Sequence, residues 1–282
     1  MKSQTNYTVK RVLGKIGTYT FLILMAMMFI CPMIFTVLSS FKDNTEIFSA
    51  PFSLPTKYRF SNYVEAWKGA NMSTYFINSI LIAFATVFIL AIVSSMAAYA
   101  LSRFQLKGNK FLTLFFLLGM MIPIHTILVP VAYVIGTFQL KNNLVALVLV
   151  YVAFSLSFSI FVLSRFMKGI NVSLEEAAII DGAGYFQIYA KIMLPLTVPA
   201  LSTISIFNFL GAWNNILFPL LFINDNNLKP IALGLLNFNG ERGSSYGPLM
   251  AAIVITVFVP MVIYLLFQEK VESGLAAGAI KE

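Results

Sequence analysis

Formal charge is confined to a few short clusters of this sequence, and six long stretches between them carry none. Each stretch is long enough to cross a bilayer, which takes about 20 apolar residues. Lipid cannot hydrogen-bond to a polypeptide backbone, so a segment that crosses it is expected to be a helix. The sequence therefore predicts an all-α integral membrane protein with about six transmembrane helices. The charge-free stretches are Ile16–Phe41, Gly69–Ser102, Phe111–Leu140, Asn142–Ser164, Ile192–Asn224 and Gly243–Gln268.

The composition agrees with this prediction. Of 282 residues, 59% are hydrophobic and 11% are charged, whereas soluble domains carry about 25% charged residues. We expect a short cytoplasmic N-terminus, residues 1–15, followed by one transmembrane domain, residues 16–282. The first span is expected to be an uncleaved helix, because its apolar run is longer than the roughly 7–15 residues of a signal-peptide core. The expected spans lie near residues 17–39, 76–100, 112–134, 144–166, 196–222 and 248–267.

The positions of Lys and Arg predict the orientation of the chain in the membrane. With the N-terminus inside, twelve of the 19 basic residues fall in cytoplasmic segments and seven in outer segments. Both termini are then expected on the cytoplasmic side of the cell membrane. The net charge of +8 does not indicate a nucleic-acid partner, because the basic residues are scattered beside apolar spans and form no Lys/Arg-rich run.

No Asp, Glu, Lys or Arg lies within the expected helix cores. Carriers driven by protons or sodium usually place ionisable groups at membrane depth. Here His125 could titrate at that depth, and a hydrogen-bonded or pore-facing histidine is favoured over a proton relay. Pro123 and Pro130 flank this histidine and predict a kinked or broken third helix.

The sequence also lacks a recognisable site for covalent chemistry. The nearest match to a phosphate-binding loop is Gly14-Lys15, which is followed by Ile16 and has no glycine-rich surroundings. The phosphate-binding pattern requires a Ser or Thr after the lysine. No catalytic or metal-ligating constellation is visible, so we expect neither enzymatic activity nor a metal or cofactor on this chain. If the protein drives uphill transport, another polypeptide must supply the energy.

One inner segment carries signals for a short helix. Ser173 and Glu176 have the spacing of a capping box, which predicts that a helix begins there, and Gly182 predicts that it ends after about two turns. A second helix is expected over Tyr185–Met193, ended by Leu194-Pro195. So short a helix needs a surface to pack on. Packing on its own bundle and docking of a partner explain these local features equally well.

The same segment resembles the EAA loop of permease subunits in binding-protein-dependent ABC importers. The Glu-Ala-Ala run, the glycine six residues after that glutamate and the later Leu-Pro all stand at the family spacing. The resemblance implies a type I ABC importer permease fold, with residues 171–195 forming a coupling helix that sits in a cleft of an ATPase subunit. ATP and Mg would then be bound by the ATPase partners. The implied coupling residues are Glu176, Ala177, Ala178, Asp181, Gly182, Leu194 and Pro195.

Two further stretches are similar to maltose-type carbohydrate permeases. They are Phe52-Ser53-Leu54-Pro55, followed by Asn62-Tyr63, and the C-terminal run Gly274–Lys281. The resemblance implies transport of a sugar or oligosaccharide. It also implies three kinds of partner: a second homologous permease, two ABC ATPase subunits and an extracellular or periplasmic sugar-binding protein. A peptide, amino acid or polyamine cargo stays open, as does, with less support, an autonomous secondary transporter.

Two groups of polar residues are candidates for contact with the cargo or its carrier. Asn208, Trp213, Asn214 and Asn215 lie in the fifth expected span. Amides there are costly unless they line water or find partners. A sugar would offer hydroxyl groups to the amides and a face to the indole, although helix-to-helix hydrogen bonding uses the same residue types. By resemblance, the outer loop with Asn239, Gly240 and Glu241 contacts the binding protein, and a solvated connector is an equal alternative.

Overall fold

The computed structural model describes residues 2–105, 107–239 and 245–279, with side chains for 14–105, 107–238 and 245–269. Every regular element within these ranges is a helix. Five of the helices are long and apolar enough to cross a membrane, or six if one bent pair counts as a single span. The predicted all-α class with about six spans is confirmed. The contacts between residues divide the chain into two compact units.

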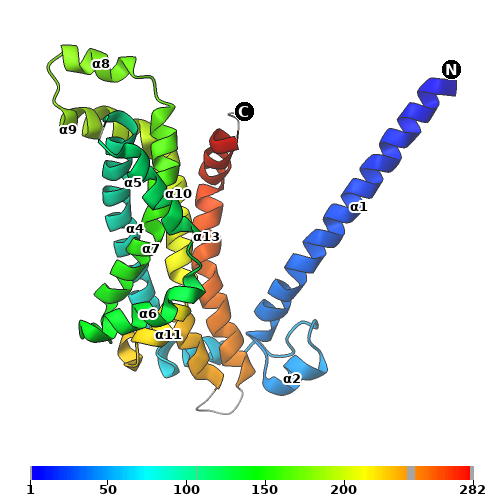
Figure 1. Ribbon diagram of the computed structural model, residues 1–282. Coiled ribbons are helices and arrows are strands. Elements are labelled where there is room, and N and C mark those ends of the chain that lie inside the picture. The colour runs from blue at the N-terminus through cyan, green and yellow to red at the C-terminus, as the bar shows by residue number, and fades with distance from the viewer. Residues whose placement is uncertain (1, 106, 240–244, 280–282) are drawn as a thin grey trace. The chain divides into compact units, whose positions relative to one another are not determined.

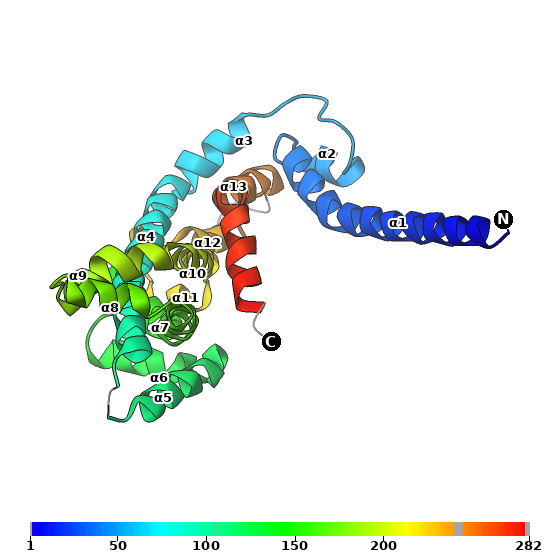
Figure 2. The ribbon, with the colours of Figure 1, turned by 90° about the horizontal axis from the view of Figure 1, so that it is seen from above.

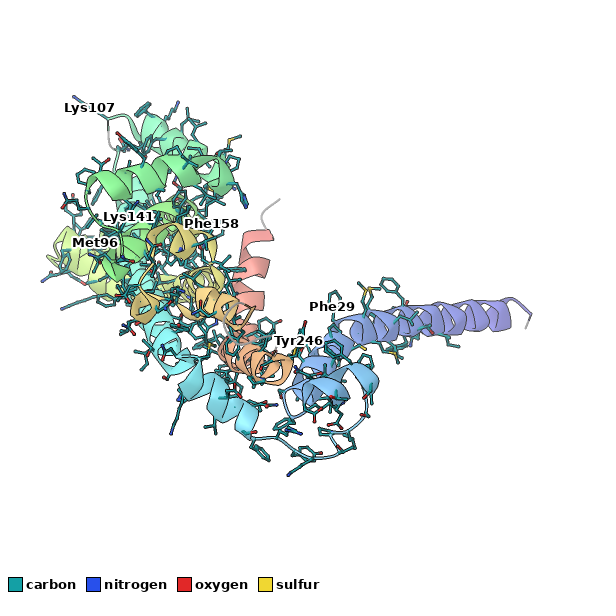
Figure 3. All side chains as sticks on the ribbon, turned by 90° about the horizontal axis from the view of Figure 1, so that it is seen from below. Phe29, Met96, Lys107, Lys141, Phe158 and Tyr246 are labelled. Carbon is teal, nitrogen blue, oxygen red and sulfur yellow. The ribbon has the colours of Figure 1, made fainter. Side chains whose placement is uncertain are left out.

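The first unit comprises Met1–Ala70 and Phe238–Ile255. It begins with α1 (Lys2–Ser39), a single long helix (Figure 1). None of the apolar window within Gly14–Ser39 is buried by the chain itself. Phe29, for example, projects from α1 with 67% of its surface exposed (Figure 3). Within its own unit, this helix is therefore left uncovered.

The segment after α1 folds on itself around a buried lysine. Lys42 is fully buried, and its ammonium group donates to the carbonyl oxygens of Ala50 at 2.8 Å and Pro51 at 3.2 Å. Asp43 caps the next helix and forms an ion pair with Arg59 at 2.7 Å. This segment contains α2 (Asn44–Ser49), α3 (Ser61–Val64) and a π-helical turn, η1 (Glu65–Gly69).

The second unit comprises Asn71–Asn237 and Thr256–Glu282. Its centre is made by α4 (Met72–Arg103), α7 (Leu144–Lys168) and α10 (Leu194–Asn214), which pack on one another (Figure 2). Leu90, Leu147 and Ile204 are buried there, each on a different helix. Figure 1 shows α8 (Ser173–Ile180) and α9 (Tyr185–Ile188) at one end of these helices and α6 (Ile124–Thr137) and α11 (Leu217–Phe222) at the other.

The third expected span is broken, as its prolines predicted. α5 (Asn109–Met121) and α6 meet at an angle of 100°. Pro123 has no backbone N–H and disfavours helical geometry at the residue before it. Ile122 accordingly adopts an extended conformation. α5 packs closely on α7 at Gly119. A Cβ atom at this position would lie only 2.5 Å from Ser157 Oγ of α7.

The expected helix end at Leu194-Pro195 is wrong. α9 continues through a π-helical turn, η2 (Tyr189–Met193), directly into α10. A proline inside a regular helix lacks one hydrogen bond and clashes with the carbonyl group four residues earlier. The wider turn, in which Leu194 donates to Tyr189 O, gives the backbone the extra room that Pro195 needs.

The fifth expected span, 196–222, is not one helix either. α10 ends at Asn214, and α11 begins at Leu217 after an extended residue, Asn215. The Asn215 side chain accepts a hydrogen bond from Phe218 N at 3.2 Å and so supports the new helix start. Beyond α11 lie η3 (Asn226–Leu228), α12 (Ile231–Gly234), η4 (Leu235–Asn239) and α13 (Tyr246–Ala279).

Candidate coupling site

The helix predicted at Ser173 exists as α8, but it does not begin with the expected capping box. The residue at its N-cap position, Val172, forms no side-chain cap. Asn171 takes part of that role, since its side-chain oxygen accepts a hydrogen bond from Ser173 N at 3.1 Å. Ser173 is therefore inside the helix instead of before it, and Glu176 is left exposed.

The predicted end of α8 at Gly182 matches the structure in detail. Gly182 has a φ of +83°, which side chains disfavour and glycine adopts freely. Gly182 N donates to Ile179 O at 3.0 Å, and Ala183 N donates to Ala178 O at 2.9 Å. These two bonds form a Schellman motif. A Cβ atom at Gly182 would meet nothing within 4 Å, so the need for glycine comes from the backbone conformation.

A buried ion pair attaches α8 to the end of α4. Glu175 is 7% exposed, and its carboxylate pairs with the guanidinium group of Arg103, the last residue of α4. Arg103 Nη2 also donates to Ile170 O at 2.8 Å. One arginine therefore holds both the segment before α8 and the helix itself.

The inner face of α8 packs on an apolar cluster. Ala178 lies one turn after Glu175 on the same face and is buried against residues of α4, α7, α9 and α10. A hydrogen bond between Ser95 Oγ and Tyr189 Oη, 2.7 Å apart, ties α4 to η2 within this cluster. The buried members are Ala98, Tyr99, Leu163, Met167, Ala178, Ile188, Tyr189, Met193, Ala200 and Ile204.

The rest of the surface of α8, with α9 and with Val172 before α8, exposes large apolar side chains. Ile180 is 85% exposed, and the neighbouring members of this group are each about half exposed or more. Exposed apolar surface of this kind marks a site of interaction. We call this surface the coupling patch, and its members are Val172, Leu174, Ile179, Ile180, Tyr185 and Phe186.

The predicted coupling residues divide between the two faces. Glu176, Ala177, Asp181 and Gly182 are exposed, as a partner contact requires, and Pro195 is exposed at the start of α10. Ala178 of α8 is buried in the apolar cluster, and Leu194 of α10 is partly buried against the same cluster.

The four candidates in the fifth span have different surroundings. Asn208 is buried and donates to Ser159 Oγ at 3.2 Å and Ile204 O at 2.7 Å. Trp213 is fully buried, donates to Thr256 O at 3.1 Å and stacks on Phe209. Asn215 supports the start of α11. Asn214 is exposed at the break between α10 and α11.

The remaining candidate residues from the sequence lie outside α8 and α10. His125 is exposed in the first turn of α6. Gly240 and Glu241 lie outside the described residues, as does the side chain of Asn239. Within the described part of the chain, no group of three or more His, Cys, Asp or Glu residues could hold a metal ion.

The pairing of Arg103 with Glu175 was not predicted. Each residue has an ordinary explanation of its own in the sequence. Arg103 is a basic residue after an apolar span, and Glu175 is an acidic residue in the first turn of a helix. Charge in the first turn suits the helix dipole, so nothing in the sequence marks Glu175 as buried. The pair arises from tertiary packing of α8 on α4.

Comparison with known proteins gives consistent matches along the chain. The sequence profile of the family described as "Binding-protein-dependent transport system inner membrane component" matches residues 91–276. A diacetylchitobiose uptake system permease protein of Streptomyces coelicolor is 35% identical over 266 residues, which cover 94% of this chain and 88% of the relative. A trehalose/maltose transport system permease protein of Thermococcus litoralis is 33% identical over 97% of this chain and 98% of the relative.

A solved structure shares the fold. It is a chain of a bacterial ABC transporter involved in the import of the acidic polysaccharide alginate, with a TM-score of 0.81, 22% sequence identity and coverage of 92% of this chain and 96% of that chain. A second structure, of a bacterial alginate transporter in complex with an alginate pentasaccharide-bound periplasmic protein, gives a TM-score of 0.67 at 17% identity over 88% of this chain and 91% of that chain.

Proposed function

Because the chain belongs to the family of inner membrane components of binding-protein-dependent transport systems, we propose that it is the permease subunit of an importer for a sugar or oligosaccharide. The predicted fold, that of a type I ABC importer permease, is confirmed by the alginate transporter chain. Relatives named for diacetylchitobiose and for trehalose or maltose support a carbohydrate cargo.

The proposed assembly has separate subunits for separate tasks. This chain and a second, homologous permease line the path, two ABC ATPase subunits bind ATP and Mg on the cytoplasmic side, and a binding protein delivers sugar outside. Both termini and α8 then lie in the cytoplasm. The 26-residue apolar segment Gly14–Ser39 of α1 supports a place for this helix in the membrane.

The observation that carries the proposal is the two-sided geometry of α8. Its inner face is fixed to α4 by Glu175 and to the apolar cluster by Ala178. Its outer face presents Ile180 and the rest of the coupling patch. A partner that grips the outer face can therefore move α4, α7 and α10 through the inner face. ATP-driven closure of the ATPases would shift the permease between inward-facing and outward-facing states, to which the partners bind differently.

The sugar contacts follow from the same proposal. Asn214, exposed where α10 breaks, is the strongest of the four candidates for touching sugar. Trp213, Asn208 and Asn215 would shape the path from within, because each already has an internal hydrogen bond. Contact of Asn239, Gly240 and Glu241 with the binding protein remains part of the proposal.

Substitution of Ile180 by Glu tests the coupling patch directly. The side chain is 85% exposed, so the change should leave folding and membrane insertion intact. A charge in the middle of an apolar docking surface should weaken ATPase binding by about tenfold or more. The measurement is the amount of ATPase subunit that co-purifies with the chain, together with sugar uptake by cells.

Ile180→Leu is the matched control, because it keeps size and apolar character at the same position. It should retain both ATPase binding and uptake. Normal co-purification and uptake with Ile180→Glu would refute a coupling role for this surface.

A further inference from the structure

A groove between α5 and α7 is not used by the coupling site. It has a volume of about 860 Å³. Its walls include Lys110, Thr113 and Leu117 of α5 and Lys168 at the end of α7. Leu114 lies between Thr113 and Leu117 in the same lining and adds a second apolar side chain. The groove therefore has a basic mouth and an apolar floor.

The mouth of the groove favours an anion. Its lining includes no acidic residue, and neither Lys110 nor Lys168 forms an ion pair within the described residues. Lys107 follows the end of α4 in the adjoining loop (Figure 3), and Arg165 lies one turn before Lys168. The first turn of α5 begins at Gly108 without a side-chain cap, and uncapped N–H groups at a helix start favour phosphate.

The depth of the groove matches one leaflet of a bilayer. Along α5 its lining runs from Lys110 to Leu117, which corresponds to about 11 Å of helix. One leaflet has a hydrocarbon thickness of about 15 Å. The lysines therefore fall at the interface, and Leu114 and Leu117 fall at the depth of acyl chains. The groove opens at the end of the bundle that carries α8, since α8 follows α7 directly.

We propose that this groove binds an anionic phospholipid of the cytoplasmic leaflet. The phosphate lies between Lys110, Lys168 and the start of α5, and an acyl chain lies against Leu114 and Leu117. The assignment to the cytoplasmic leaflet rests on the proposed function, whereas the binding chemistry does not. A free phosphate would use the lysines but would leave the apolar floor uncovered.

A bound lipid has a structural consequence for α5. No residue of α5 is buried by the chain itself, although the helix packs against α7. A lipid held by side chains of both helices adds contacts at their shared surface. The groove thus joins α5 to α7 close to where α7 leads into the coupling helix.

The test is lipid binding to the full chain, purified with whatever subunits accompany it and analysed by native mass spectrometry. Dioleoyl phosphatidylglycerol should bind more tightly than dioleoyl phosphatidylcholine. Lys110→Gln with Lys168→Gln should weaken phosphatidylglycerol binding by roughly 30-fold, about fivefold for each lysine. Both lysines are exposed, so folding should be unaffected. Lys57→Gln with Lys68→Gln, two exposed lysines of the segment after α1, removes the same charge and should have no effect.

Two further arms separate a lipid from a free anion. Leu117→Trp fills the apolar floor while both lysines remain, and it should also weaken phosphatidylglycerol binding. Excess inorganic phosphate should not displace the lipid. Equal affinity for the two lipids, unchanged binding by the lysine variant or displacement by phosphate would overturn the proposal. Lipid binding is measured separately from sugar uptake. A chain that did not transport sugar could therefore still give any of these binding results.

Discussion

Glu175 and Glu176 are adjacent in the sequence and have opposite environments in the structure. Glu175 is buried and paired with Arg103, whereas Glu176 is exposed beside the coupling patch. Successive residues of an α-helix point about 100° apart around its axis, so the two side chains lie on different sides of α8. The glutamate at position 175 thus holds α8 in place, whereas the glutamate at position 176 is free to contact a partner.

Removing the charge from each glutamate should have different effects. Glu175→Gln leaves the buried Arg103 without a counter-charge and should lower the free energy of unfolding by about 3–5 kcal/mol. Glu176→Gln should leave unfolding unchanged and should lower ATPase binding and uptake. Thermal unfolding in detergent and ATPase co-purification measure the two effects. Equal unfolding temperatures for Glu175→Gln and the unmodified chain would contradict the buried pair.

The double substitution Arg103→Met with Glu175→Met is the control for that pair. Replacing both charges by apolar side chains avoids an unpaired buried charge and is often close to neutral for stability. The double variant should therefore be more stable than Glu175→Gln alone. Such non-additivity is expected of two residues in direct contact.

At the scale of elements, two short-range signals in the sequence held and two did not, since the capping box expected at Ser173 and Glu176 is also absent. Gly182 ends α8 because its backbone needs a positive φ, and Pro123 breaks the third span because it lacks an N–H group. The Leu194-Pro195 prediction failed because a π-helical turn relieves the proline, and that turn is a property of the packed helix. The ion pair of Arg103 could not be read from the sequence, since it depends on how α8 folds back on α4.

Gly182→Ala should loosen the end of α8. The left-handed conformation costs a non-glycine residue about 1–2 kcal/mol, so the backbone amides of α8 should exchange with solvent several times faster. Gly184→Ala is the matched control, because Gly184 has an ordinary extended backbone and open space around it. Hydrogen exchange over residues 173–183 measures the effect. Identical exchange in the two variants would contradict the role given to Gly182.

At the scale of the whole molecule, composition was enough to predict the membrane class, but it did not show which surfaces the chain leaves uncovered. Charge-free stretches indicated about six transmembrane helices. The described residues contain five helices that are long and apolar enough to cross a membrane, or six if the bent pair is one span. The exposed apolar surface of the coupling patch became visible with side-chain burial. This surface agrees with a subunit that works within an assembly.

The central claim is that force for transport enters this chain through α8 from separate ATPase subunits. The most direct measurement is ATP-driven uptake of labelled oligosaccharides, such as maltose and diacetylchitobiose, into reconstituted vesicles. Vesicles that hold the purified complex, with ATP on the ATPase side and the binding protein on the other, should accumulate sugar. Vesicles that hold this chain alone should not, and accumulation by the chain alone would contradict the claim.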